Sequence, residues 1–228
     1  MIDTLTSTPF FGLGVTLLCW YLAVRFQKRT GLLICNPVLV ASLLVIGIML
    51  LFHIPLDNYN AGGSIIKLLL APATAVLALN IYQQRAILKQ HFWPVVLGCF
   101  VGSLVSMLLV QVLCRLFQAE ASLLNSLLPK SVTTAIAVSV SESNGGLAGL
   151  TAASVCLTGV EGAMLAPLFA KVFHVTDPVA EGVAIGACSH AVGTSKALEI
   201  GPLQGAMSSI ALCVCGIITS ILAMFFAA

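Results

Sequence analysis

The segment from Leu128 to Gly146 concentrates the residues of this chain that could bind an anion. It places a lysine, several hydroxyls, a glutamate and two glycines within an otherwise apolar sequence. Pro129 suits the first turn of a helix here, with Ser126 or Asn125 as its cap. Because free amides at a helix start beside a lysine attract anions, the segment predicts an anion-binding site. If the segment is helical, one face carries Lys130, Thr133, Thr134, Ala137 and Ser141.

A second explanation stays open for this polarity. The hydroxyls also suit a helix–helix contact, in which small residues allow close approach. Lys130 and Glu142 suit that explanation less well, because a charge inside a membrane is costly. The end of the segment, SESNGG, favours an unwound backbone that lines a cavity, with Gly145 and Gly146 at its turn.

Two later segments also interrupt apolar runs with polar residues. Glu161 stands between Gly159 and Gly162, with Pro167 beyond them. This pattern predicts a break in a helix with a carboxylate placed at it. Further on, the run GACSHAVGTSK lies at the centre of an apolar span. One helical face of that span carries His190, Gly193, Thr194 and Ala197.

Together these segments suggest a site for a small carboxylate. Lys130 would supply the charge, and Gly145, Gly146 and Gly193 would supply cavity backbone. Hydrogen bonds would come from the hydroxyls of Ser131, Thr133, Thr134, Ser189 and Thr194.

The remaining titratable residues each allow two roles. His190 is either a proton relay, because histidine titrates near physiological pH, or a histidine hydrogen-bonded in a packed interior. Lys196 is either a second cation or the partner of Glu199, three residues on. Glu142 and Glu161 either accept coupling protons or pair with the lysines.

The composition is that of an integral membrane protein. Of the 228 residues, 59% are hydrophobic and 8% are charged, whereas soluble domains are about 25% charged. At about 20 apolar residues per crossing, the chain holds about seven or eight transmembrane helices with short loops. If the polar segment from Leu128 to Gly146 enters the membrane and returns on the same side, seven crossings remain. We therefore expect an all-α polytopic membrane protein, with residues 1–228 as a single membrane domain and two or three interrupted helices.

Several functional classes are disfavoured. The net charge of +2 comes without an extended basic patch, which argues against a nucleic-acid partner. The eight cysteines show no CxxC or Cys/His spacing, so we expect neither a metal nor another cofactor. The absence of HExxH and GxSxG motifs argues against an enzyme.

The apolar runs set the expected order of elements. A small-residue ridge at Gly98, Gly102 and Ser106 should let another helix approach closely. The segment 55–64, which contains no lysine or arginine, is expected to be a loop. Spans are expected at about residues 10–24, 32–54, 65–82, 93–116, 179–198 and 203–226, and a further apolar segment, interrupted at Glu161, at 147–173.

Four motifs resemble the LrgB/CidB family and come in its order over nearly the whole chain. They are PKSVTT from Pro129, the pair Gly145-Gly146, SHAVGT from Ser189 and QGAMSS from Gln204. Asn36-Pro37 and the PATAVLAL run from Pro72 also resemble the family pattern. The chain departs from that pattern where a proline is usual at Ala135 and at Asn80, and where a glutamate is usual at Gln204.

The resemblance implies a multi-pass protein of the bacterial inner membrane, often accompanied by a smaller LrgA-type subunit or acting as a homo-oligomer. The family was first described as modulating murein hydrolase export and autolysis. Similar sequences belong to the plastid glycolate/glycerate translocator, and bacterial relatives are linked to pyruvate movement. Combined with the polar residues, this favours a transporter for a small monocarboxylate such as pyruvate, glycolate or glycerate. The alternative is a holin/antiholin-like membrane protein that modulates murein hydrolase export and autolysis.

The basic loops predict the orientation of the chain. Five basic residues lie in two alternate loops, Arg25, Lys28 and Arg29 in one and Arg85 and Lys89 in the other. By the positive-inside rule these loops are cytoplasmic, and the N-terminus is periplasmic. In a cysteine-free background, Asp57→Cys should therefore react with an impermeant thiol reagent in intact cells, and Gln84→Cys should not. Reaction at position 84 alone would reverse the orientation.

Overall fold

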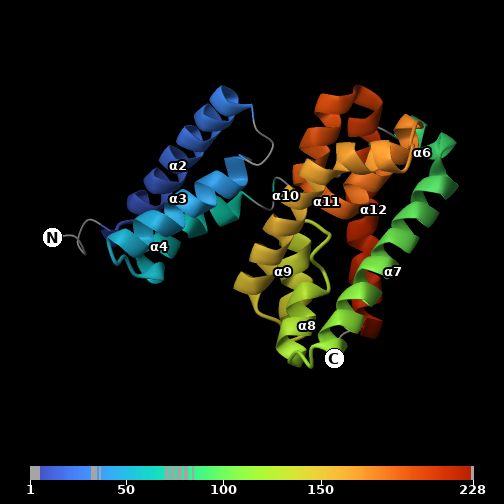
Figure 1. Ribbon diagram of the computed structural model, residues 1–228. Coiled ribbons are helices and arrows are strands. Elements are labelled where there is room, and N and C mark those ends of the chain that lie inside the picture. The colour runs from blue at the N-terminus through green and yellow to red at the C-terminus, as the bar shows by residue number, and fades with distance from the viewer. Residues whose placement is uncertain are drawn as a thin grey trace. The chain divides into compact units, whose positions relative to one another are not determined.

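The computed structural model describes residues 6–31, 35, 37–69, 72, 75, 79, 82–83 and 85–226, and these residues form helices and no strand (Figure 1). Asn36, Asn80, Gln84 and the part of the PATAVLAL run that contains Thr74 lie outside the described residues. The chain divides into two compact units, Met1–Ala75 and Val76–Ala228.

The first unit contains three helices, α2 (Pro9–Thr30), α3 (Pro37–Leu51) and α4 (Leu56–Leu68). Helix α2 packs against both of the others. It ends where Gly31 adopts a left-handed conformation with φ 64°, and the Gly31 amide donates to the Gln27 carbonyl.

The expected loop at 55–64 is wrong, because α4 covers most of it. Its glycines serve helix packing. Gly12 of α2 faces Gly62 of α4, and a methyl group added at either position would run into the backbone of the other helix. Two glycines at a crossing let the backbones approach, which stabilises a helix that composition alone disfavours.

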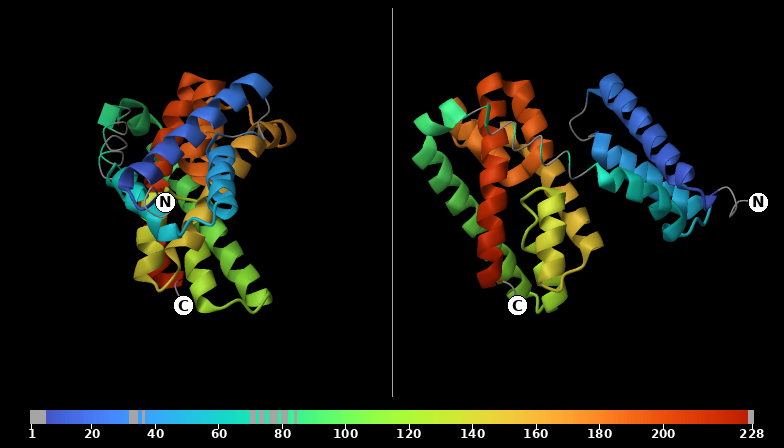
Figure 2. Two further views of the ribbon diagram at one scale, coloured as in Figure 1. Left: turned by 90° about the vertical axis from the view of Figure 1, so that its left-hand side faces the viewer. Right: turned by 180° about the vertical axis from the view of Figure 1, so that it is seen from behind.

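The second unit is built from seven helices in the described residues. Figures 1 and 2 show α7 and α12 running side by side, with the short α8 beside the C-terminal end of α7 and α9 next to α8 and α10. Helix α11 packs most extensively against α12 and also contacts α10 and α7. The elements are α6 (Arg85–Gln90), α7 (Phe92–Leu116), α8 (Ala121–Leu127), α9 (Thr134–Ser143), α10 (Ala148–Val172), α11 (Pro178–Ile200) and α12 (Pro202–Phe226).

Two apolar clusters hold this unit together. The larger one joins residues of α7, α9, α10, α11 and α12 with Val132, which precedes α9. The smaller one joins the end of α7 to α8 and the end of α12, through residues such as Cys114, Leu128 and Ala223. The two clusters fix both ends of α9 and the loop that precedes it.

Four described helices, α2, α7, α10 and α12, are long and apolar enough to cross a membrane, and α3 is a shorter apolar helix. The outer side of α7 exposes Leu97, Val101, Val105 and Leu109, which suits contact with lipid. The chain is therefore an all-helical, multi-pass membrane protein, and the count of seven or eight crossings stays a prediction.

The ridge on α7 packs as expected. A methyl group built at Gly98 would lie 3.5 Å from Cγ1 of Val183, and one built at Gly102 would lie 3.7 Å from Cβ of Ala187. One turn further along, the Ser106 hydroxyl lies 2.8 Å from the Ser131 hydroxyl. The ridge thus packs against α11 at Gly98 and Gly102 and against the loop before α9 at Ser106.

Candidate functional site

The polar segment folds as a loop followed by a short helix. After α8 ends at Leu127, the amide of Lys130 donates to the Leu127 carbonyl at 3.2 Å and the amide of Val132 to the Pro129 carbonyl at 3.3 Å. Thr133 is extended, with φ −62° and ψ 147°, and α9 begins after it. The predicted helix start at Pro129 is therefore wrong, and Lys130 and Ser131 belong to the loop.

The predicted caps of that helix have another role. The Asn125 side-chain amide donates to the Asn144 carbonyl at 2.6 Å, and the Ser126 hydroxyl accepts from the Leu147 amide at 2.7 Å. Both side chains are buried and hold the turn between α9 and α10. They satisfy backbone groups that would otherwise lack partners in a membrane protein.

This turn is the predicted SESNGG interruption. Gly145 has φ 78°, a conformation that favours glycine. Gly146 packs against the Ser141 hydroxyl and the backbone of α8, so a larger residue has no room there. The buried Ser141 hydroxyl accepts a 2.7 Å bond from the Thr151 hydroxyl. The structure thus gives Gly145 a turn conformation and Gly146 a packing contact.

Helix α11 is interrupted at Ser189 and His190. Ser189 has φ −134° and ψ 15°, and His190 has φ 41° and ψ −137°. The Ser189 hydroxyl donates to the Ile185 carbonyl at 2.6 Å, and Nε2 of His190 lies 2.9 Å from the Val155 carbonyl oxygen. The Thr194 hydroxyl donates to the His190 carbonyl at 2.8 Å, so buried side chains hold both sides of the break.

The geometry of His190 matches the packed-interior alternative. Its ring is buried, and Nε2 is engaged with a backbone oxygen. The face shared by His190, Gly193, Thr194 and Ala197 is buried as a whole. Thr194 also bonds to the Ser208 hydroxyl of α12 at 2.8 Å, which ties this face to the neighbouring helix.

The predicted break at Glu161 is wrong, because α10 is continuous from Ala148 to Val172 with Pro167 inside it. Glu161 is exposed. The glycines beside it make room for the break in α11. A methyl group at Gly159 would lie 2.5 Å from Cε1 of His190, and one at Gly162 would overlap the Ser189 side chain.

The candidate charges are separated. Nζ of Lys196 lies 2.8 Å from a carboxylate oxygen of Glu199, so this lysine is paired. Glu142 is exposed near the end of α9. Lys130 is half-buried. Between side chains that the structure describes, the Lys196–Glu199 contact is the single ion pair, so neither Glu142 nor Glu161 pairs with a lysine.

Thr133 is the one residue of the described chain whose buried side-chain oxygen lacks a hydrogen-bond partner. Its side chain makes no capping bond, and the residue is 8% exposed. A buried hydroxyl without a partner costs free energy, and such groups in native proteins often mark a site for a ligand or ion. Beside it lie the free first-turn amides of α9 and, three residues earlier, Lys130.

The start of α9 and the break in α11 lie at one level along α10. Because a short turn joins α9 to α10, the two helices run in opposite directions from the Ser141–Thr151 bond. Thr134 is two helical turns from Ser141, or about 10 Å. The same distance along α10 leads past Val155, which bonds to His190, toward Gly159. The Lys130–Thr134 segment and the Ser189–His190 break therefore lie at similar heights along α10.

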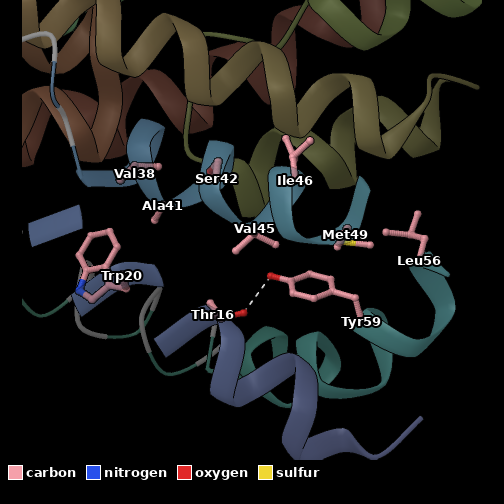
Figure 3. Close-up of a pocket in the computed structure, with 10 residues that line it drawn as sticks. All are labelled: Thr16, Trp20, Val38, Ala41, Ser42, Val45, Ile46, Met49, Leu56 and Tyr59. Atoms are coloured by element: carbon pink, nitrogen blue, oxygen red, sulfur yellow. Dashed lines mark hydrogen bonds between the residues drawn. The ribbon is translucent and has the colours of Figure 1, made fainter. Parts of the chain in front are cut away.

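A separate cavity of about 390 Å³ lies within the first unit, between α2, α3 and α4 (Figure 3). The hydroxyls of Thr16 and Tyr59 meet at 2.8 Å on its wall, and no charged residue lines it. Its volume lies within the usual range for small-molecule sites, but its apolar lining does not suit a carboxylate. This cavity could not be predicted from the sequence, because its lining residues carry no motif.

A comparison with known families matches residues 16–228 to the LrgB-like family. The chain belongs to this family. Proteins named antiholin-like protein LrgB from Bacillus mycoides (strain KBAB4), Bacillus cereus (strain B4264) and Bacillus anthracis (strain CDC 684 / NRRL 3495) are each 34% identical to it. The similarity spans 222 residues, 97% of this chain and 96% of each relative. No solved structure matches the chain.

A side-chain contact joins α12 to α11. The side-chain amide of Gln204 donates to a carboxylate oxygen of Glu181 at 3.2 Å. A glutamate at position 204 would place two like charges together. The pairing could not be found from the sequence, because the two residues are 23 positions apart on different helices.

The contrast between Thr133 and Thr151 gives a direct test of the unpartnered hydroxyl. Both residues are buried, but the Thr151 hydroxyl bonds to the Ser141 hydroxyl at 2.7 Å and to the Leu147 carbonyl at 3.1 Å. Thr151→Val should destabilise the purified protein by about 1–3 kcal/mol, because it leaves buried partners unsatisfied. Thr133→Val should have little effect or be stabilising without ligand. Thermal unfolding in a mild detergent measures both, and equal losses would show that the Thr133 hydroxyl is already satisfied.

Proposed function

We propose that this protein is an antiholin-like membrane protein that modulates murein hydrolase export and autolysis. The observation that carries the proposal is full-length similarity to relatives named antiholin-like protein LrgB. The role is non-enzymatic and belongs in the bacterial inner membrane, with the N-terminus in the periplasm. A smaller LrgA-type subunit, or further copies of this chain, would complete the assembly.

The test is complementation of a Bacillus strain from which the LrgB gene has been deleted. Expression of this chain should lower extracellular murein hydrolase activity, seen on a zymogram, and slow lysis relative to the empty vector. Co-expression with an LrgA-type subunit tests whether the effect requires that partner. A strain that lyses like the vector control, despite membrane-inserted protein, contradicts the proposal.

A second candidate function, transport of a small monocarboxylate, is favoured by the unpartnered hydroxyl of Thr133 beside Lys130. Lys130 is half-buried and has no carboxylate partner among the described side chains. A cation, a free hydroxyl and the amide end of a helix all favour negative charge. Pyruvate, glycolate and glycerate each offer a carboxylate for the lysine and a second oxygen for the hydroxyl.

Lys130→Met separates the two functions. One charge-assisted hydrogen bond is worth about 1.5–3 kcal/mol, so its loss should weaken carboxylate uptake by roughly ten- to a hundredfold in apparent affinity. Insertion should not suffer, because removing a charge lowers the cost of membrane placement. Lys130→Arg should retain more activity, and Lys171→Met, which removes an exposed lysine at the end of α10, should behave like the parent.

The measurement is carboxylate flux into liposomes at matched protein content, with and without an LrgA-type subunit. Parent-like flux from Lys130→Met would remove this residue from the pathway. Loss of flux with unchanged control of lysis would assign the two effects to different parts of the molecule.

A further inference from the structure

Cys188 lies where the first half of α11 ends. The residues on either side of it, Ala187 and Ser189, are buried, whereas Cys188 itself is exposed. Ser189 and His190 then leave helical geometry. The Cys188 thiol is therefore accessible at the end of a helix segment, and packing and hydrogen bonds hold the residues on either side of it in place.

The α7 ridge sets the position of this thiol relative to the polar loop. Gly102 packs against Ala187, and Ser106, four residues later on the same helix face, bonds to Ser131. Ala187 and Ser131 thus rest on neighbouring turns of α7, about 6 Å apart along the helix. Their chain neighbours are Cys188 and Lys130, so the fold places both residues beside the same two turns of α7.

The surroundings of the Lys130 ammonium favour an anion. Glu142 is at the opposite end of α9 from Lys130 and is exposed, and Glu161 is exposed on α10. The nearby Thr133 hydroxyl is buried without a partner at the start of α9. A positive charge, an unpartnered hydroxyl and the start of a helix therefore follow one another within residues 130–134, and no described carboxylate pairs with the lysine.

We propose that Cys188 borders a binding site for a small anion formed by Lys130, Thr133 and the start of α9. A bound anion shields the thiol, and an empty site draws negatively charged reagents to it. The identity of the anion as a carboxylate rests on the transport candidate above. The site itself is independent of any transport activity.

The test uses two methanethiosulfonate reagents of similar size, one carrying a sulfonate and the other a trimethylammonium group. In each reaction the Cys188 thiolate attacks the sulfenyl sulfur, a disulfide forms, methanesulfinate leaves, and the thiol proton passes to water. Peptide mass spectrometry of the full native chain in neutral detergent reads the extent of reaction at Cys188, so the other seven cysteines stay in place.

Each rate is first divided by the rate of the same reagent with a small free thiol, because the two reagents differ in intrinsic reactivity. The ratio of these normalised rates is the decisive quantity, because any effect on the fraction of thiolate cancels from it. Lys130 should make the anionic reagent react roughly tenfold faster than the cationic one. Lys130→Met should bring the ratio near unity, whereas Lys171→Met should leave it unchanged. A parent ratio near unity, or one that Lys130→Met does not alter, overturns the proposal.

Protection distinguishes the sources of the anion. Pyruvate, glycolate or glycerate should slow labelling of the parent more than chloride at equal ionic strength. Protection by phosphatidylglycerol vesicles alone, relative to phosphatidylcholine vesicles, would assign the site to a lipid headgroup and overturn the carboxylate assignment. A Lys130-dependent ratio in a protein that moves no carboxylate would uphold the anion site and reject the transport function.

Discussion

The close approach of α10 to the interrupted part of α11 is the constraint on which the arrangement of the polar residues around α9 and α11 depends. Gly159 and Gly162 carry no side chains where His190 and Ser189 must pass, and larger residues would collide with them. The bond between the His190 ring and the Val155 carbonyl then joins the break to α10. In a membrane protein such a break is stable only when its freed backbone groups face protein or a water-filled space.

The same requirement explains why so many small polar residues are buried around α9. Ser126, Asn125 and Thr151 satisfy the turn and the helix ends on the α8 side. Thr194 joins the second half of α11 to α12 through Ser208. These residues are structural hydrogen-bonding groups, and their satisfaction makes the unsatisfied Thr133 hydroxyl informative.

The two candidate functions draw on different parts of this arrangement. An antiholin-like role depends on the membrane bundle and its partners, and the similarity to named relatives supports it over the whole chain. A transport role depends on the few residues around Lys130. Among the residues that the structure describes, this lysine has no carboxylate partner and the Thr133 hydroxyl has no hydrogen-bond partner.

The sequence by itself determined the class of protein, the family and the polar segments, because hydropathy and motifs are properties of neighbouring residues. The buried face of α11 and the packing ridge of α7 were likewise predictable, since helical periodicity places residues three and four apart on one side. The helix start at Thr134, the continuity of α10 and the helical character of α4 were decided by tertiary structure. In each case the local pattern was compatible with more than one backbone conformation. Contacts with distant residues selected the conformation that the structure shows. In the sequence, the glycines near Glu161 suggested a flexible backbone. In the fold, their missing side chains leave room for the side chains of His190 and Ser189 from α11.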